Sequence, residues 1–237
     1  MNIICAKNYE ELSKIGAAAI AEQLLAKQDS VLGFATGSTP EGTYKELVNL
    51  YRQGVIDFSC ATTFNLDEYY GTPKEDPNSY YAFMHKNLFD HINVQGDHVH
   101  LPNGSAPDAE EECKTYEEKI VLAGGIDLQL LGIGINGHIG FNEPSGIFPG
   151  ATNHVKLTGS TIDANSRFYS SRDEVPRSAL TMGIGTIMAA KKILLLISGS
   201  VKKDIAKKAL YGPVTPGVPA SILQFHPDVT VVCDNEI

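Results

Sequence analysis

Two kinds of hydrophobic pattern alternate along the chain. Short, continuous apolar runs predict buried strands at 2–5, 31–35, 62–66, 127–133, 193–198 and 229–233. Between them, apolar residues recur with helical spacing over 9–27, 40–54, 78–92, 106–124 and 201–212. Strands that are apolar on both sides are typical of parallel sheets covered by helices on both faces. The pattern therefore predicts an α/β protein with a Rossmann-like, three-layer fold and a mostly parallel open sheet.

Residues 142–178 form the one long stretch without a clear pattern, and they include three arginines, one of which is Arg167. In a compact domain, a segment of this length is usually a functional loop or a lid. No internal repeat and no linker rich in proline or glycine divides the chain. We therefore expect a single catalytic domain over 1–237, with a mobile lid at about 157–177.

Composition and charge narrow the class of function. A content of 43% hydrophobic and 20% charged residues is typical of a folded globular protein. The formal net charge of −9 argues against binding to nucleic acid or to an anionic membrane, because both require clustered positive charge. The longest aliphatic run, at 193–197, is far shorter than the roughly 20 residues that span a bilayer. With no apolar leader near Met1, the expected location is the cytoplasm.

The four cysteines are scattered, without the spacing that zinc sites or disulfide frameworks use. We therefore expect reduced thiols and no bound metal. The sequence GIGING at 132–137 does contain the GxGxxG pattern of dinucleotide-binding loops. That pattern requires a helix directly after the glycines, and here Gly140 and Pro144 would break such a helix. The glycines instead predict backbone that passes close to a small ligand.

The same loop carries the polar residues Asn136, His138, Asn142 and Glu143, directly after a predicted buried strand. A histidine at this place can move protons near neutral pH, and a carboxylate five residues later can return to orient its ring. A purely structural histidine is the alternative. The four polar residues together, in a glycine-rich loop at a strand end, favour catalysis.

Two further turns favour an anionic ligand. Thr36, Gly37, Ser38 and Thr39 follow a buried strand and precede a helix that begins near Pro40, so free N–H groups and the helix dipole face the turn. No Walker sequence follows, so a single phosphate suits this turn better than a nucleoside triphosphate. An ordinary capped turn is the alternative. Lys202, at the start of the last predicted helix, opposes the helix dipole and is expected to serve an anion there.

Asp67 and Glu68 follow the strand at 62–66. An acidic pair at a strand end can cap a helix or bind a metal ion. Because ligands of parallel sheets bind beyond the carboxyl ends of the strands, this pair should face the same site as the turns described above. A carboxylate that acts as a base then becomes an attractive interpretation.

These segments resemble one family over essentially the whole chain. The sequences TGSTPEGTYKEL, TFNLDEYYG, DPNSYYAFM, GIGINGHIGFNEP, NSRF and SGSVKKDIA occur in the order found in glucosamine-6-phosphate deaminases, the aldose–ketose isomerising enzymes of amino-sugar breakdown. The element GHIGFNEP is specific, because the related 6-phosphogluconolactonases carry a GHTASLFP-like sequence there. They also typically end the acidic motif in DER, where this chain has DEY.

The resemblance implies a reaction and a set of roles. Glucosamine 6-phosphate would be isomerised and deaminated to fructose 6-phosphate and ammonium, without a metal or an organic cofactor. His138 would open the sugar ring, Glu143 and Asn136 would orient its imidazole, and Asp67 would move a proton from C2 to C1. The phosphosugar would be bound by Thr36, Gly37, Ser38, Thr39, Gly137, Arg167 and Lys202.

Two departures from the family pattern qualify this expectation. Many relatives carry Asp where this chain has Asn136, and an amide can orient a ring but lacks the negative charge. The chain also ends soon after its last predicted strand, whereas longer hexameric relatives continue. We expect a monomer or small homo-oligomer with weak or absent allosteric activation. The rival functions are a 6-phosphogluconolactonase-like hydrolase and a non-catalytic sugar-phosphate sensor.

Overall fold

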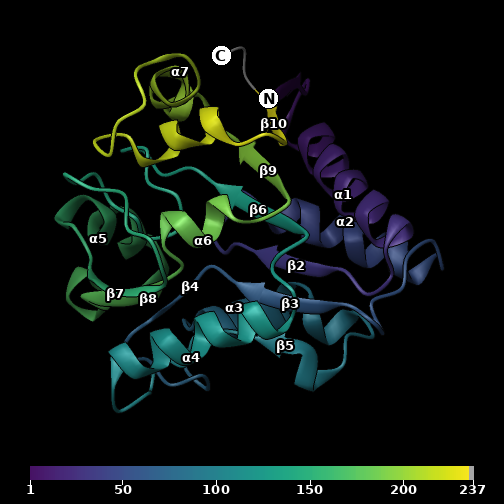
Figure 1. The fold of residues 1–237 in the computed structure, drawn as a ribbon, viewed down its shortest axis with the longest axis horizontal. Helices are drawn as coiled ribbons and strands as arrows, with labels where there is room; N and C mark the ends of the chain where they lie inside the picture. Colours follow the sequence, from purple (N-terminus) through teal and green to yellow (C-terminus); the bar gives the residue numbers. More distant parts are fainter. Residues whose placement is uncertain (235–237) are drawn as a thin grey trace.

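A computed structural model describes residues 1–234, and its centre is a seven-stranded sheet (Figure 1). Its strands are β1 (Asn2–Cys5), β2 (Val31–Phe34), β3 (Thr62–Asn65), β5 (Val99–His100), β6 (Leu128–Gly132), β9 (Lys192–Ile197) and β10 (Val229–Cys233). They lie in the order β1-β10-β9-β6-β2-β3-β5, and every neighbouring pair is parallel. The predicted mostly parallel sheet is thus confirmed, although the two-residue strand β5 was not predicted.

A second, antiparallel sheet has three strands in the order β4-β8-β7 and was not predicted. Its members are β4 (Asp67–Tyr69), β7 (Asn153–Lys156) and β8 (Ser178–Thr181). Each has only three or four residues, and β7 lies inside the weakly patterned segment 142–178. The chain reaches this sheet directly from β3, because Leu66 alone separates β3 from β4.

The helices are α1 (Tyr9–Ala26), α2 (Glu41–Arg52), α3 (Tyr80–Asn87), α4 (Ala109–Leu122), α5 (Gly159–Asn165), α6 (Ile184–Met188) and α7 (Lys203–Tyr211). The last predicted helix begins with a 3-10 turn, η5 (Ser200–Lys202), so Lys202 precedes α7 and does not lie in its first turn. Another such turn, η3 (Ser166–Phe168), follows α5 directly. None of the described helices is both long and apolar enough to cross a bilayer.

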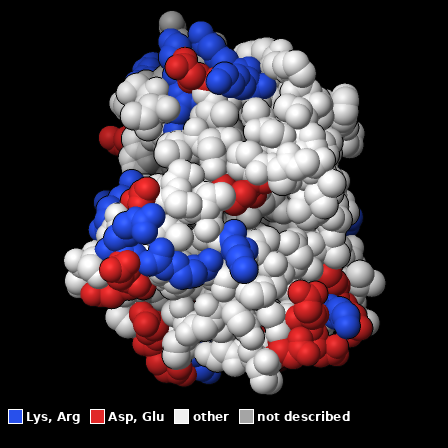
Figure 2. All heavy atoms as spheres, turned by 90° about the vertical axis from the view of Figure 1, so that its left-hand side faces the viewer, with Lys and Arg blue, Asp and Glu red and all other residues white. Residues whose placement is uncertain are grey.

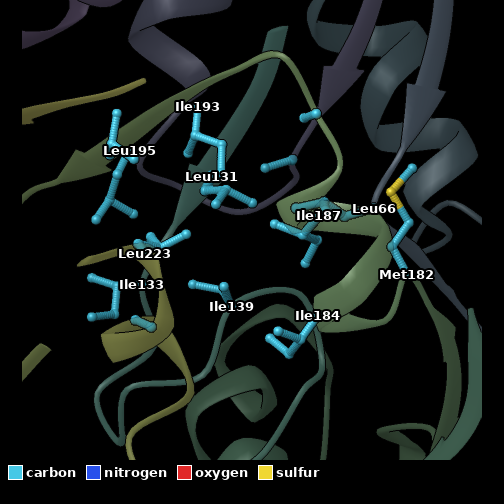
Figure 3. Packing of buried hydrophobic residues seen from close by; sticks show 14 of the residues in the cluster. Leu66, Leu131, Ile133, Ile139, Met182, Ile184, Ile187, Ile193, Leu195 and Leu223 are labelled. Atoms are coloured by element: carbon cyan, nitrogen blue, oxygen red, sulfur yellow. The ribbon is translucent and has the colours of Figure 1, made fainter. Parts of the chain in front are cut away.

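Two hydrophobic clusters fill the spaces on either side of the large sheet. Strand β9 shows the arrangement, since Leu194 and Leu196 pack with α1, α2 and α3, whereas Leu195 packs with α4, α6 and α7. Figure 3 shows part of the cluster that contains Leu195, in which Leu131 and Ile193 lie beside side chains from α6. The sheet is therefore buried on both faces, and the three-layer α/β prediction is confirmed.

The order of the strands places a crevice between β2 and β6. From β2 the chain continues through β3 to β5 on one side, and from β6 it continues through β9 to β10 on the other. The connections that leave the carboxyl ends of β2 and β6 therefore diverge. In open α/β sheets, ligands bind at this switch in direction.

Truncating the core at Leu131 tests the packing on which this architecture depends. Leu131 is 1% exposed, so Leu131→Ala should lower the free energy of unfolding by about 2–5 kcal/mol, because a cavity replaces the lost side chain. Leu122→Ala is the matched control, because Leu122 is 86% exposed and should change stability by no more than about 0.5 kcal/mol. Urea denaturation measures both variants, and equal losses would contradict the assigned core.

Candidate active site

A cavity of about 670 Å³ lies at the carboxyl edge of the large sheet. Four neighbouring strands, β9, β6, β2 and β3, each send the loop that follows them to this place. Of the residues singled out from the sequence, the cavity is lined by Thr36, Gly37, Ser38, Thr39, Asp67, His138, Arg167 and Lys202. Asn136, Gly137 and Glu143 do not line it. The structure thus gathers the candidate base, the candidate imidazole and the phosphate-binding candidates around one space large enough for a sugar phosphate.

Asp67 is the first residue of β4, at the point where the chain leaves one sheet for the other, and it is 5% exposed. Burial, with a smaller contribution from the charge of Glu68, raises the pKa of its carboxyl group to about 8. Among the described residues, no Lys, Arg or His side chain forms an ion pair with Asp67 that would stabilise its charge. A carboxylate in such a place binds a proton readily, as a general base must.

Glu68 has a different role from that of its neighbour. Its carboxylate accepts hydrogen bonds of 2.9 Å from three backbone N–H groups, those of Tyr69, Tyr80 and Tyr81. Burial raises the pKa of Glu68, and these three donors oppose that rise. Since Tyr80 and Tyr81 begin α3, Glu68 caps this helix. The acidic pair therefore divides into one residue that faces the cavity and one that holds a helix.

His138 belongs to a tight loop after β6, in which the Gly134 N–H donates to the His138 carbonyl at 2.9 Å. A side chain at position 134 would collide with the imidazole, because a Cβ atom there would lie 2.3 Å from both Cε1 and Nε2 of His138. Gly134, the second glycine of the GxGxxG pattern, is therefore required because the His138 ring packs against its Cα atom. This requirement does not involve a dinucleotide.

Glu143 lies behind this ring. Its Oε2 atom is 3.5 Å from His138 Nδ1, longer than a normal hydrogen bond, and it accepts a hydrogen bond of 2.7 Å from the Asn136 side-chain amide. Despite the burial that opposes it, these contacts and a hydrogen bond from Thr161 hold the pKa of Glu143 at about 2. Asn136 also accepts a 3.2 Å hydrogen bond from the backbone N–H of His138. Asn136 thus contacts both Glu143 and the backbone of His138, and it makes no direct hydrogen bond to the imidazole among those of the described residues.

Two other residues of the loop support its shape. Gly137 has a φ of +90°, and a Cβ atom there would approach Val218 and Ile205, away from the cavity. Any contact that Gly137 makes with a ligand would have to come from its backbone. Asn142 is 2% exposed, and its amide donates to the carbonyls of Ile139 and Met182 at 2.9 and 2.8 Å. Asn142 therefore holds the loop together and belongs to the scaffold.

The turn after β2 meets a cation from the segment around α5. Gly37 has a φ of +96°, which a glycine adopts without strain, and the turn leads into α2. The Arg167 guanidinium donates to Ser38 Oγ at 3.3 Å, so residues 129 positions apart in the sequence meet here. On the other side of the turn, the Tyr9 hydroxyl lies 3.0 and 3.1 Å from the carbonyls of Ser38 and Thr39.

Lys202 approaches the same turn from the loop after β9, and its Nζ donates to Thr39 Oγ1 at 3.2 Å. Burial and the nearby positive charge of Arg167 lower the pKa of Lys202. No ion pair within 4.0 Å joins Arg167 or Lys202 to a carboxylate among residues 1–234. Two cations beside a turn of hydroxyls and backbone N–H groups form a site that an anion would stabilise.

The surface charge agrees with this local arrangement. Figure 2 shows a group of Lys and Arg side chains in the middle of the face on which α5 lies in Figure 1, with acidic side chains both beside and below it. The formal net charge of the whole chain is −9. Positive side chains are thus concentrated locally on a protein whose net charge is negative.

Three residues that the structure brings to the site were not predicted from the sequence. Tyr80 lines the cavity, and its ring stacks on Phe141 with centroids 6.0 Å apart. Thr158 and Thr161 donate hydrogen bonds to Glu143. The threonines lie three positions apart at the start of a helix, a spacing that is visible in the sequence but common wherever a helix is capped. Among the described residues, no cluster of three or more His, Cys, Asp or Glu side chains could hold a metal ion.

Comparison with known proteins defines the class to which this fold and site belong. Residues 7–232 match the family model of glucosamine-6-phosphate isomerases and 6-phosphogluconolactonases, and the chain belongs to that family. Among its relatives, a glucosamine-6-phosphate deaminase of Clostridium botulinum (strain Langeland) is 55% identical over 236 residues, which cover 100% of this chain and 97% of the relative. A deaminase of the same name from Thermoanaerobacter pseudethanolicus is also 55% identical, covering 100% and 93% of the two chains.

Solved structures separate the two branches of the family. A monomeric glucosamine-6-phosphate deaminase superimposes with a TM-score of 0.97 at 48% identity, covering 100% of this chain and 98% of the other. A 6-phosphogluconolactonase from Thermotoga maritima reaches 0.77 at 21% identity, with 98% of each chain covered. At 21% identity, the similarity to the 6-phosphogluconolactonase shows only that the two proteins share a fold. The resemblance to the deaminases that the sequence motifs indicated is thus confirmed.

Replacing Asp67 by asparagine tests whether its carboxyl group is as poorly solvated as the structure indicates. A pKa of about 8, above the ordinary 3.8, means that the folded protein binds more protons than the unfolded chain between these values. The ionising carboxyl group therefore costs the wild type stability as pH rises from about 4 to about 8. Asp67→Asn avoids that cost, so its melting temperature should exceed that of the wild type by a margin that grows over this range.

Differential scanning calorimetry between pH 5 and pH 8.5 measures the margin. Asp29→Asn is the control, because Asp29 is exposed and its replacement should produce a difference that does not grow with pH. A margin for Asp67→Asn that stays constant or shrinks with rising pH would show that the carboxyl group ionises without difficulty.

Proposed function

We propose that the protein converts glucosamine 6-phosphate into fructose 6-phosphate and ammonium, as an aldose–ketose isomerase and deaminase of amino-sugar breakdown. The observation that carries the proposal is that a single cavity combines a cationic, hydroxyl-rich turn with the buried carboxylate of Asp67 and the imidazole of His138. Relatives at 55% identity that bear the deaminase name, matched over the whole of this chain, support the same reaction.

The 6-phosphate binds at the turn formed by residues 36–39. Backbone N–H groups of the turn that leads into α2, the hydroxyls of Ser38 and Thr39, and the cations of Arg167 and Lys202 would all face it. Hydrogen bonds between charged partners are stronger than neutral ones, so this anchor fixes the position of the sugar. The rest of the substrate then extends toward Asp67 and His138, across the same cavity.

His138 opens the pyranose ring. An imidazole can accept the proton of the anomeric hydroxyl and supply a proton to the ring oxygen as the bond between C1 and that oxygen breaks. Glu143, with its pKa of about 2, stays ionised and stabilises the positive charge that the imidazole gains. The 3.5 Å separation between Glu143 Oε2 and His138 Nδ1 would shorten once that charge develops.

Asp67 then takes the proton from C2 of the open-chain aminoaldose. The C1 carbonyl acidifies this proton, so the step requires neither a metal nor an organic cofactor. The electron pair of the C2–H bond forms the C1–C2 double bond of an enolamine, while the C1 oxygen gains a proton and the substrate's ammonium group gives one up. Return of the C2 proton from Asp67 to C1 then gives a protonated 2-imino sugar. Water adds to the imine carbon, and ammonium leaves as the ketone of fructose 6-phosphate forms. The positive amino group of the substrate favours the charged form of Asp67, which burial disfavours in the free enzyme.

Three further features belong to this proposal. Segment 157–177, which contains α5 and Arg167, acts as a lid over the single catalytic domain. The protein is a monomer or a small homo-oligomer, which is supported by the high similarity to a solved deaminase that is monomeric. Its location in the cytoplasm remains a prediction from the sequence, and cell fractionation would test it.

Ammonium release from glucosamine 6-phosphate, measured by a coupled glutamate dehydrogenase assay, tests the proposed reaction. The wild type should release ammonium and fructose 6-phosphate in equal amounts. Asp67→Asn should lower kcat by about 10²–10⁴-fold, because a positioned base is lost, while calorimetric binding of the substrate changes little. A wild type that releases no ammonium but hydrolyses 6-phosphogluconolactone would instead establish the rival function, and binding without either reaction would indicate a sensor.

Lys202→Met tests the phosphate anchor. Loss of one charged hydrogen-bond donor should raise KM for glucosamine 6-phosphate by about 10–100-fold, because such a bond contributes about 1.5–3 kcal/mol. Lys203→Met is the matched control, because Lys203 is the next residue, is exposed and does not line the cavity. Steady-state kinetics of both variants decide the matter, and similar KM values for the two would refute the assignment of Lys202.

A further inference from the structure

The carboxylate of Glu143 is held by two different parts of the chain. Its Oε2 atom faces Asn136 and His138, which belong to the loop after β6. Its other oxygen, Oε1, accepts a hydrogen bond from Thr158 Oγ1 at 3.1 Å and another, short one from Thr161 Oγ1. The side chain of Glu143 is only 11% exposed, so these hydroxyls replace solvent as its hydrogen-bond donors.

Both threonines lie at the start of α5. Thr158 is the residue before the helix, and its hydroxyl also accepts the backbone N–H of Thr161 at 3.3 Å, so it caps α5 and contacts Glu143 at once. Thr161 is 4% exposed and lies within the first turn. Its hydroxyl has no such capping role, which makes it the cleaner probe of the contact with Glu143.

The other end of the same short segment reaches the phosphate-binding turn. Arg167, in the 3-10 turn that follows α5, donates to Ser38 Oγ at 3.3 Å. Between the two ends, Ile162 is buried in a small cluster that includes Tyr69 and Phe141, and Asn165 donates to the Tyr69 hydroxyl at 2.9 Å. Segment 158–167 thus contacts Glu143 at one end and the turn formed by residues 36–39 at the other.

We propose that Thr158 and Thr161 are positioning residues for the ring-opening step, and that binding of phosphate to Arg167 fixes them through α5. When phosphate holds Arg167, α5 is held in place, and its two hydroxyls fix Glu143 at the distance from His138 that proton transfer requires. This inference rests on the proposed function, because it concerns the same imidazole and the same substrate phosphate. It adds two residues and a direction of coupling that the reaction scheme itself does not contain.

Physical chemistry favours such an arrangement for a carboxylate that must stay charged in a place with little water. Two hydroxyl donors stabilise the charge without neutralising it, and the hydrogen bond from Thr161 is among the contacts that hold the pKa of Glu143 low. Without them, one oxygen would remain unsatisfied, and the side chain would turn toward water or other donors. Since a displacement of about 1 Å can cost roughly a hundredfold in rate, the orientation of Glu143 affects turnover directly.

The first test compares Thr161→Val with Thr161→Ser. Valine keeps the shape of threonine and removes only the hydroxyl, so kcat for ammonium release should fall by about 10–100-fold while KM changes by less than about threefold. Serine keeps the hydroxyl and should restore kcat to within about threefold of the wild type. A residue needed only for folding would instead lower the melting temperature and leave the kcat of the folded fraction unchanged.

If Thr161→Val folds poorly, Thr161→Ala provides the same comparison with serine. Circular dichroism and thermal unfolding establish the folded fraction of each variant. A folded Thr161→Val or Thr161→Ala variant whose kcat is within twofold of the wild type would overturn the proposal, provided that the wild type releases ammonium. A wild type that releases none would overturn the proposed function first, so the two failures are distinguishable.

The coupling to phosphate is tested by a double-mutant cycle between Thr161→Val and Arg167→Ala. If α5 transmits the anchoring of Arg167 to Glu143, the valine substitution should cost less than about twofold in kcat once Arg167 is absent, because Glu143 is then no longer fixed. Losses in kcat that simply multiply would overturn the coupling and leave the threonines with a local role only. Steady-state kinetics at saturating glucosamine 6-phosphate supply the four values.

Discussion

Asp67 begins β4 at the place where the chain crosses from the large parallel sheet to the small antiparallel one, and burial there raises its pKa to about 8. The cost of burying a carboxyl group is the constraint around which the site is arranged. Glu68, next in the chain, is satisfied by three backbone N–H groups, whereas Asp67 is left to face the cavity. Folding therefore creates a strong proton acceptor, which the amino group of the substrate would stabilise in its charged form.

The proposed reaction poses a second electrostatic problem, because a protein with a net charge of −9 would have to bind an anion. The solution is local: one turn supplies hydroxyls and helix N–H groups, and Arg167 and Lys202 reach it from distant parts of the chain. Burial and mutual repulsion lower the pKa of Lys202 in the absence of a ligand. A bound phosphate would offset the repulsion between Lys202 and Arg167.

Much of the fold could be predicted from the sequence, because continuous apolar runs such as 127–133 and 193–198 leave little choice but buried parallel strands. The meeting of the loops after these strands at one edge of the sheet was also predicted, because parallel strands direct their carboxyl ends to the same edge. The small antiparallel sheet could not be predicted, because strands such as Asp67–Tyr69 and Asn153–Lys156 are too short for their alternation to be recognised. Thr158 and Thr161 were missed for a related reason, since only the fold brings α5 against Glu143. The catalytic and binding roles assigned to single residues remain predictions.

The central claim is that the Asp67 carboxylate moves the proton between C2 and C1. Its most direct test follows the hydrogen itself, with glucosamine 6-phosphate deuterated at C2 and product analysis by NMR and mass spectrometry. The wild type should show a primary isotope effect and pass the deuterium to C1 or to water, whereas Asp67→Asn should bind the sugar and retain deuterium at C2. Loss of C2 deuterium by Asp67→Asn at a rate close to that of the wild type would contradict the account.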